Sequence, residues 1–584
     1  MKSIVLATLA GLALAAPPKN PIPAPVRPRI APPSPALDAR AADVTVAIDS
    51  GSIVGKSTGT VESFGGIPYA DPPTGSNRLH PPVKLSSSLG TFDATGAAGA
   101  CPQFFINSED NNWLLEVVAD VINLPFFQEA TGISEDCLTM SVQRPAGVAE
   151  GDDLPVLFWI FGGGFELGWS SMYDGTGLVT QGVDLNEPFV FVRVNYRVGG
   201  FGFMPGAEIL ADGASNLGLL DQRMGLEWVA DNIKKFGGDP NKVTIWGESA
   251  GAISVFDQMA LYDGDHTYNG KALFRGAIMN SGSVVPADTV DCPKGQAIYD
   301  TVVSEAGCSG AADTLECLRG LDYEDFLSAA TAVPGILSYN SVALSYLPRP
   351  DGTVLTQSPD VLAAAGMYAA VPMIIGDQED EGTLFSFFQS NTTSTTAKIV
   401  DYLSSIFFHG ATDAELTGLV ETYTKSLSAG SPFRTGIWNE IYPGFKRLAA
   451  ILGDLVFTLT RRLFLNIHVA NYPDVPCWSY LASYDYGTPI LGTFHGSDLL
   501  QVFFGILPNY ASHSIQTYYI NFVNTLDPNT AADAATAESY MDWPEWKGDK
   551  QLMQFFDDSA ALLADDFRAD SYEYLEANSL SLYI

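Results

Sequence analysis

The chain has 584 residues and 46% of them are hydrophobic, so it is long enough to bury a large core or to form several domains. Its formal net charge is −37 at pH 7, and phosphate backbones and anionic membrane surfaces repel a chain of that charge. Because no basic stripe offsets this repulsion, we expect no nucleic-acid partner.

The first predicted element is a signal peptide over residues 1–15. Lys2 precedes an apolar run, and Ala13 and Ala15 form a small-residue A-x-A cleavage site, a pattern typical of secretory signal peptides. The alternative is a buried N-terminal helix. No other stretch is long and charge-free enough to span a bilayer, and the C-terminal NSLSLYI carries neither an ER-retention signal nor a GPI-type tail. We therefore expect a secreted, extracellular glycoprotein with no transmembrane segment.

A proline-dominated stretch follows, which we assign to a pro-segment or spacer over residues 16–42 because such sequences favour extended chains over packed cores. Residues 43–584 contain no comparable linker and no internal repeat, so we expect one domain. The cysteines suit an oxidising compartment, but their spacing alone does not determine how they pair. They lie at positions 101, 137, 292, 308, 317 and 477.

The segment GKSTG (55–59) is the first of two matches to the serine-nucleophile pattern G-x-S-x-G. A catalytic serine of this type needs a strand before it and a helix after it, whereas GKSTG lies between the short β-rich runs SIV and TVESF and reads as a hairpin. It also fails as a phosphate-binding loop, because Ser50 stands where the first glycine is required. We therefore interpret Ser57 as a surface turn residue.

The middle of the chain alternates between strand and helix patterns. Apolar β-rich runs at 155–161 and 189–196 predict buried parallel strands, and helical spacing over 217–236 ends in Gly-Gly, a stop signal. Another strand pattern, KVTIW, follows at 242–246. This alternation predicts an α/β fold.

The second match, GESAG (247–251), has the required context, since VTIW precedes it and the helical pattern AGAISVFDQMAL follows it. Ser249 is therefore the candidate nucleophile. The glycine-rich FGGGF (161–165) directly follows a predicted strand, as do the oxyanion-binding loops of lipases and esterases. The alternative for FGGGF is a glycine turn that only reverses the backbone.

A serine nucleophile also needs an acid and a histidine, in the chain order Ser, acid, His. Four acids follow a short predicted strand in IIGDQEDEGTLF, and the residues alone do not choose among Asp377, Glu379, Asp380 and Glu381. Acid clusters at strand ends are usually solvated. The histidines late enough in the chain are His409, His468, His495 and His513. His468 falls in a helical run that favours a packed or surface role, whereas His495 lies in the loop GTFHGSD.

Six segments together resemble the type-B carboxylesterase/lipase family, whose members include fungal lipases and esterases, cholinesterases and bile-salt-activated lipase. They are FGGGFELG, VNYRVGGFGF, NLGLLDQRMGLEWVADNIKKFGGDPNKVTIWGESAG, SEDCL, DEGTLF and GTFHGSD. The resemblance extends from about Val44 to near the C-terminus. It implies that residues 43–584 form an α/β-hydrolase catalytic domain, with a central, mostly parallel sheet flanked by helices and a disulfide-bounded, lid-like loop.

The resemblance also implies the site residues. The family's glutamate matches Glu381, its histidine matches His495, and its oxyanion donors match the N–H groups of Gly163, Gly164 and Ala250. The disulfides of fungal members match Cys101 with Cys137 and Cys308 with Cys317. Cys292 and Cys477 fall outside that pattern and are left, by elimination, to pair with each other.

The implied activity is hydrolysis of carboxylic esters with apolar acyl groups through an acyl-enzyme, without a metal or organic cofactor. One alternative is a catalytically inactive, cholinesterase-like adhesion or binding protein, although all three catalytic residue types are present. A second alternative is a protease, since the same triad cleaves amides. The residues leave open whether the substrate is a triacylglycerol, a sterol ester or a short soluble ester.

Between Cys101 and Cys137, the segment 111–127 predicts an amphipathic helix that Asn112 could cap. Its polar stripe is narrow, and apolar residues cover the rest. One interpretation is plain core. The other, which the resemblance favours, is a lid that closes over the site in water and makes transient contact with a lipid interface.

Overall fold

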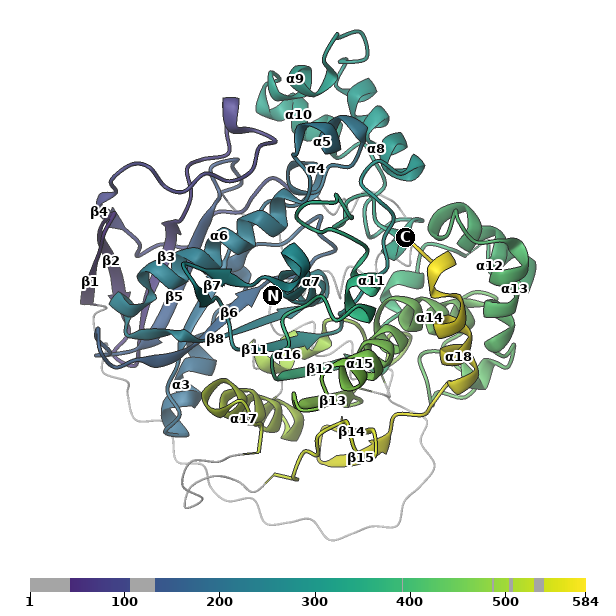
Figure 1. Cartoon of the computed structure of the whole chain (residues 1–584). Coiled ribbons are helices and arrows are strands. Elements are labelled where there is room, and N and C mark those ends of the chain that lie inside the picture. The colour runs from purple at the N-terminus through teal and green to yellow at the C-terminus, as the bar shows by residue number, and fades with distance from the viewer. Residues whose placement is uncertain (1–41, 105–131, 391, 486–487, 504–507, 530–539) are drawn as a thin grey trace, which may run out of the picture. The chain divides into compact units, whose positions relative to one another are not determined.

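One sheet of thirteen strands organises the part of the chain that this computed structural model describes, namely residues 42–104, 132–390, 392–485, 488–503, 508–529 and 540–584 (Figure 1). The strands are β1 (Ala42–Ile48), β2 (Gly51–Ser57), β3 (Val61–Pro68), β4 (Gly90–Asp93), β5 (Thr139–Pro145), β6 (Leu154–Ile160), β7 (Val190–Val194), β8 (Gly238–Glu248), β11 (Gly276–Asn280), β12 (Met373–Gln378), β13 (Cys477–Ala482), β14 (Gln551–Phe555) and β15 (Ala560–Ala564). Their order is β1-β2-β3-β5-β7-β6-β8-β11-β12-β13-β14-β15, and β4 pairs with β2. A separate small hairpin joins β9 (Thr267–Tyr268) to β10 (Lys271–Ala272).

The strands from β7 to β14 run parallel, and antiparallel strands flank them on both sides. The central strands are apolar and buried along almost their whole length, as β6 and β7 illustrate. A parallel strand covered by helices on both faces needs this composition, because neither face contacts water. The sheet is therefore the central layer of an α/β fold, as the alternation of strand and helix patterns predicts, and it agrees with the α/β-hydrolase fold that the family resemblance implies.

Two groups of helices pack along the sheet. α6 (Leu217–Asn232), α7 (Ala250–Gly264), α11 (Pro359–Ala364) and α15 (Leu459–Asn471) contact one another in series, and α7 also contacts β6, β8 and β11. α3 (Thr176–Asp184) packs with α17 (Tyr510–Thr525) on the opposite face (Figure 1). The remaining helices are α4 (Gly199–Gly202), α5 (Ala207–Asp212), α8 (Pro293–Glu305), α9 (Thr314–Arg319), α10 (Tyr323–Ala330), α12 (Thr396–Tyr402), α13 (Asp413–Thr422), α14 (Phe445–Gly453), α16 (Ser497–Val502) and α18 (Ala569–Asn578).

The structure confirms the strand–helix–strand pattern that the sequence predicts in the middle of the chain. The run at 155–161 becomes β6, the run at 189–196 becomes β7, and KVTIW becomes the inner part of β8. The helix predicted over 217–236 is α-helical to Asn232 and tightens into a 3₁₀ turn over Ile233–Phe236. Gly237 then ends it with a φ of +84°, a conformation that glycine adopts without strain.

Ser57 lies where the hairpin interpretation placed it. It is the last residue of β2 and pairs with Glu62 of the antiparallel β3. Its hydroxyl accepts a hydrogen bond from the N–H of Gly59 in the turn, at 3.2 Å. Because no helix follows, GKSTG lacks the geometry of a nucleophile turn.

Two disulfides join Cys101 to Cys137 and Cys308 to Cys317, which confirms both predicted pairs. The pairing of Cys292 with Cys477 is wrong, because both are buried free thiols. Each has a separate structural role: Cys292 caps α8, where its Sγ accepts a hydrogen bond from the Gly295 N–H, and Cys477 begins the central strand β13.

The described residues all belong to one compact unit that begins at Ala41. The expected signal peptide (1–15), nearly all of the expected spacer (16–42) and the expected lid helix (111–127) lie outside the described residues. Within the described ranges, no helix combines the length and apolar character that crossing a membrane requires.

Candidate active site

Ser249 occupies the sharp turn between β8 and α7, at the carboxyl end of a central strand. Its φ of 57° and ψ of −127° are strained for a side chain with a Cβ atom, and its N–H donates to the Asn280 carbonyl at 2.9 Å. The flanking glycines have a steric reason: a Cβ on Gly247 would lie 2.3 Å from the Gly251 backbone, and one on Gly251 would lie 2.1 Å from the Ile160 oxygen. The strand–turn–helix context predicted for GESAG is therefore confirmed.

His495 and Glu381 come from loops that follow two adjacent parallel strands, β13 and β12. His495 Nδ1 and Glu381 Oε2 are 2.6 Å apart, and Glu381 Oε1 accepts the Gln378 N–H at 2.7 Å. The two loops are held together one residue earlier, since Asp380 and Phe494 form a parallel β-bridge. Both side chains are buried, so the carboxylate fixes the orientation of the imidazole ring away from bulk water.

The other three acids of the cluster have different partners. Asp377 pairs with the buried Arg461 at 2.8 Å, and Glu379 pairs with Arg434. Asp380 accepts hydrogen bonds from the Ser431 hydroxyl and from the N–H groups of Phe433 and Thr493. The expectation of a solvated cluster is wrong, because all but Glu379 are buried. Their roles are structural, and only Glu381 reaches a histidine.

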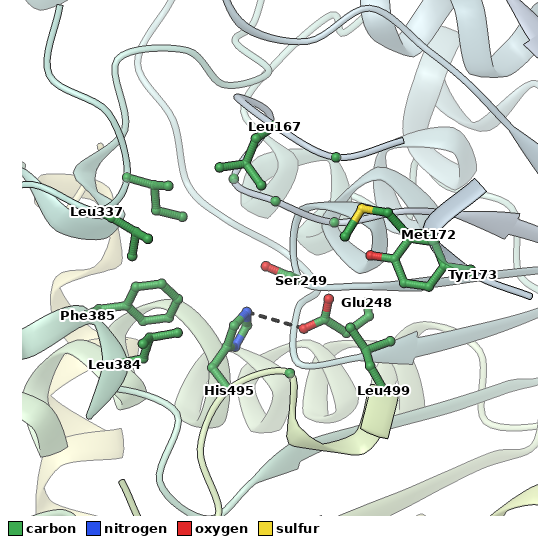
Figure 2. Close-up of a pocket in the computed structure, with 16 residues that line it drawn as sticks. Leu167, Met172, Tyr173, Glu248, Ser249, Leu337, Leu384, Phe385, His495 and Leu499 are labelled. Atoms are coloured by element: carbon green, nitrogen blue, oxygen red, sulfur yellow. Dashed lines mark ion pairs between the residues drawn. The ribbon is translucent and has the colours of Figure 1, made fainter. Parts of the chain in front are cut away.

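Glu248, the residue before the candidate nucleophile, is a site residue that sequence reasoning missed. Its Oε1 lies 3.3 Å from His495 Nε2, and both side chains are buried (Figure 2). Burial raises the pKa of Glu248 to about 8. Burial alone lowers the pKa of His495, but the negative charges of Glu381 and Glu248 outweigh that effect and raise it to about 9. The sequence signal that could have identified Glu248 is its place next to the candidate nucleophile, as the glutamate of GESAG.

His495 Nε2 makes no hydrogen bond to any other described residue. Figure 2 shows the imidazole ring beside Glu248 and below the Ser249 hydroxyl, and His495 and Ser249 line the same cavity. Imidazole with one nitrogen held by a carboxylate and the other open toward a serine is the arrangement needed for proton transfer from that serine.

The glycine-rich loop after β6 lies beside Ser249. Gly163 and Gly164 have φ values of +113° and +62°, which explains the need for glycine at both positions. Their N–H groups, and that of Ala250 at the start of α7, donate no hydrogen bond to another residue in the described ranges. Three free donors beside a serine can bind a developing negative charge.

Glu166 directly follows this loop in the chain and is a second residue that the sequence analysis missed. It is fully buried, and its carboxyl oxygens accept the N–H groups of Ile336 at 2.7 Å and Ser345 at 3.3 Å. Burial raises the pKa of Glu166 to about 8. The Glu166 N–H donates to the Gly163 carbonyl at 3.1 Å, so Glu166 joins the glycine-rich loop through its backbone to the segment 336–345 through its side chain.

A cavity opens at this site between the glycine-rich loop, Ser249 and His495. Apart from Glu248, Ser249, His495 and Tyr173, the side chains that line it are apolar, and Figure 2 shows Leu167, Leu337, Leu384 and Phe385 around the serine hydroxyl. An apolar cavity with a few convergent polar groups is typical of a small-molecule site.

The other late histidines lie in other environments. His468 is buried in α15 between the Tyr368 hydroxyl and the Val475 carbonyl, which confirms its packed role. His409 and His513 are exposed. None of these three lines the cavity.

Comparison with known proteins agrees with this geometry. Residues 42–574 match the carboxylesterase family. The chain is 63% identical to the secreted triacylglycerol lipase LIP1 of Gibberella zeae over 95% of this chain and 94% of the relative. It is 57% identical to secreted lipase 1 of Botryotinia fuckeliana, over 94% of each chain. The crystal structure of Aspergillus niger EstA superimposes with a TM-score of 0.77 at 26% identity, covering 93% of this chain and 99% of that one.

Proposed function

Because the chain belongs to the carboxylesterase family and is a carboxylic-ester hydrolase, we propose that Ser249, His495 and Glu381 form its catalytic triad. The observation that carries this assignment is the 2.6 Å contact between His495 Nδ1 and Glu381, with His495 Nε2 free of hydrogen bonds within the described ranges and its ring in the same cavity as Ser249. No second histidine or serine in the described ranges has these partners. The inactive binding-protein alternative is disfavoured, since the site retains every element that ester hydrolysis requires.

In this mechanism, His495 Nε2 accepts the Ser249 proton as the hydroxyl oxygen attacks the ester carbonyl carbon. Glu381 holds the imidazole in the tautomer with its proton on Nδ1 and stabilises the imidazolium that forms. The N–H groups of Gly163, Gly164 and Ala250 bind the oxyanion, and each such donor is worth roughly 3 kcal/mol of transition-state stabilisation.

The tetrahedral intermediate collapses when His495 returns the proton to the departing alcohol oxygen. This leaves the acyl group on Ser249 Oγ. Water then attacks the acyl carbon with His495 again as base, which releases the carboxylic acid and restores the serine.

We propose that the natural substrates are esters with long apolar acyl chains, triacylglycerols among them. The apolar lining of the cavity supports this class, since each buried CH₂ group of a chain contributes about 0.8 kcal/mol. The names of the two fungal relatives point the same way. We further propose that the protein is secreted and makes transient contact with lipid surfaces through the 111–127 segment.

The direct test is covalent labelling with an organophosphate ester followed by peptide mapping. We expect one modified residue, Ser249, and loss of hydrolysis in proportion to labelling. Ser249→Ala should abolish hydrolysis of p-nitrophenyl esters, and Ser57→Ala, the matched control with the same local motif, should retain it. Modification of Ser57, or comparable loss from Ser57→Ala in a folded protein, would contradict the assignment.

A further inference from the structure

A second cavity lies beside the first and shares four of its lining residues: Gly164, Ser249, Ile336 and Phe385. The two cavities therefore meet at the proposed nucleophile. The second one extends along helix α7, whose residues Ala250, Ile253 and Asp257 line it. That spacing places the three side chains on one face of the helix.

Asp257 is unlike the other residues that line this cavity. Apart from Ser249, all of the other described lining residues are apolar. Asp257 is completely buried, and neither of its carboxyl oxygens has a hydrogen-bond partner among the described residues. Burial raises the pKa of this carboxyl well above its usual range, which favours the neutral acid, a group with one O–H donor and a free acceptor.

An unpaired buried carboxyl is costly, and native proteins normally satisfy such groups. No described residue near Asp257 supplies a hydrogen-bond partner, but a ligand that occupies the cavity can. A plain alkyl chain lying against Asp257 leaves both oxygens unpaired. A hydroxyl group on that chain can donate to one oxygen and accept from the other, which matches the neutral acid in both roles.

The position of Asp257 sets where on the chain the hydroxyl would lie. α7 is regular from Ala250 to Ala260, and Asp257 follows Ser249 by eight residues. At about 1.5 Å per residue, the carboxyl lies roughly 12 Å along the helix from the reacting ester. That distance corresponds to the middle of a long acyl chain rather than to its carboxyl end.

We propose that Asp257 is a specificity-determining residue that favours acyl chains carrying a mid-chain hydroxyl group. The proposal rests on the proposed function, because the acyl chain must extend from Ser249 into the second cavity. It adds a substrate class to that function: esters of hydroxylated long-chain fatty acids.

The test compares ricinoleoyl and oleoyl esters of one alcohol, whose acyl chains differ by a single mid-chain hydroxyl. The measured quantity is the ratio of kcat/KM for ricinoleoyl over oleoyl ester, with active enzyme counted by organophosphate titration. In Asp257→Leu, which keeps the shape and removes both polar atoms, we expect the ratio to fall about tenfold. In Asp257→Asn, which keeps a neutral donor and acceptor, we expect it to stay near the wild-type value.

Ser254→Ala is the matched control on the same helix. Ser254 is also buried and polar, but it bonds Gln222 and does not line the cavity. An unchanged ratio in Asp257→Leu, or an equal fall in Asp257→Leu, Asp257→Asn and Ser254→Ala, would overturn the proposal while ester hydrolysis persists. Failure of the wild type to hydrolyse either ester would instead overturn the proposed function on which it rests.

Discussion

Replacing Glu248 with Gln should move the pH dependence of hydrolysis toward acid. His495 accepts a proton only when its ring is neutral, so kcat/KM of the free enzyme falls as pH drops below the His495 pKa. Burial lowers that pKa, but Glu381, Glu248 and Asp498 outweigh burial and raise it to about 9. Removing one of these negative charges lowers the pKa, and the neutral ring then persists to lower pH.

The size of the shift follows from the contact between Glu248 Oε1 and His495 Nε2. A full charge pair at 3.3 Å contributes about 5 kcal/mol at an effective dielectric constant of about 20, which is equivalent to roughly 3–4 pH units. Burial raises the pKa of Glu248 itself to about 8, close to that of His495, so Glu248 carries only part of its charge over the pH range in which His495 titrates. We therefore expect a shift of about one to two units.

The assay is a pH profile of kcat/KM for a soluble p-nitrophenyl ester in buffers of constant ionic strength. Glu166→Gln is the matched control, because Glu166 is also a buried glutamate with a pKa raised to about 8, but its carboxyl bonds Ile336 and Ser345 instead of the histidine. It should reduce the rate without moving the acid limb. An acid limb that stays in place in Glu248→Gln, or that moves equally in Glu166→Gln, would refute the reasoning.

Three further outcomes are expected. Glu381→Gln should fold and lose about 10³- to 10⁴-fold in kcat, whereas Asp377→Asn should mainly lower the melting temperature; kinetics and thermal unfolding of both variants separate the two. Replacing Cys308 and Cys317 with Ser should lower the free energy of unfolding by about 2–3 kcal/mol, measured by denaturant titration with the Cys101–Cys137 bond intact. Activity should rise when substrate passes from solution into emulsion, and Ser substitutions on the apolar face of 111–127 should depress activity on emulsions more than on soluble short esters. Equal loss on both substrates would identify that segment as core.

Local sequence pattern predicted the parts of the fold and site that are local in the chain. The strand–turn–helix around Ser249 and the glycine-rich loop at 161–165 each lie within one short segment. Hydrophobic periodicity and the placement of glycines are therefore enough to predict them. Glu381 and His495 could not be chosen this way. They are 114 residues apart and meet only because β12 and β13 are neighbours in the sheet, so the family resemblance had to supply them.

The residues missed by sequence reasoning share a physical cause. The importance of Glu248 and Glu166 comes from burial and from partners contributed by distant segments, and that of Asp257 comes from burial beside a cavity without a partner in the described ranges; none of these properties has a sequence periodicity. The wrong pairing of Cys292 with Cys477 has the same origin, because elimination ignored where the fold places each thiol. For Asp257 the sequence did contain a signal, because it is the one acidic residue within the apolar stretch AGAISVFDQMAL.

The shared brace at Glu166 has a consequence for anyone who redesigns this protein. Ile336 lines both cavities, and its N–H donates to the carboxyl of Glu166, the residue whose own N–H bonds Gly163 in the glycine-rich loop. A substitution that reshapes the 336–345 wall to admit a bulkier acyl group therefore also moves the oxyanion donors. Acyl selectivity and turnover are mechanically coupled here, and directed evolution for one should select compensating changes around Glu166.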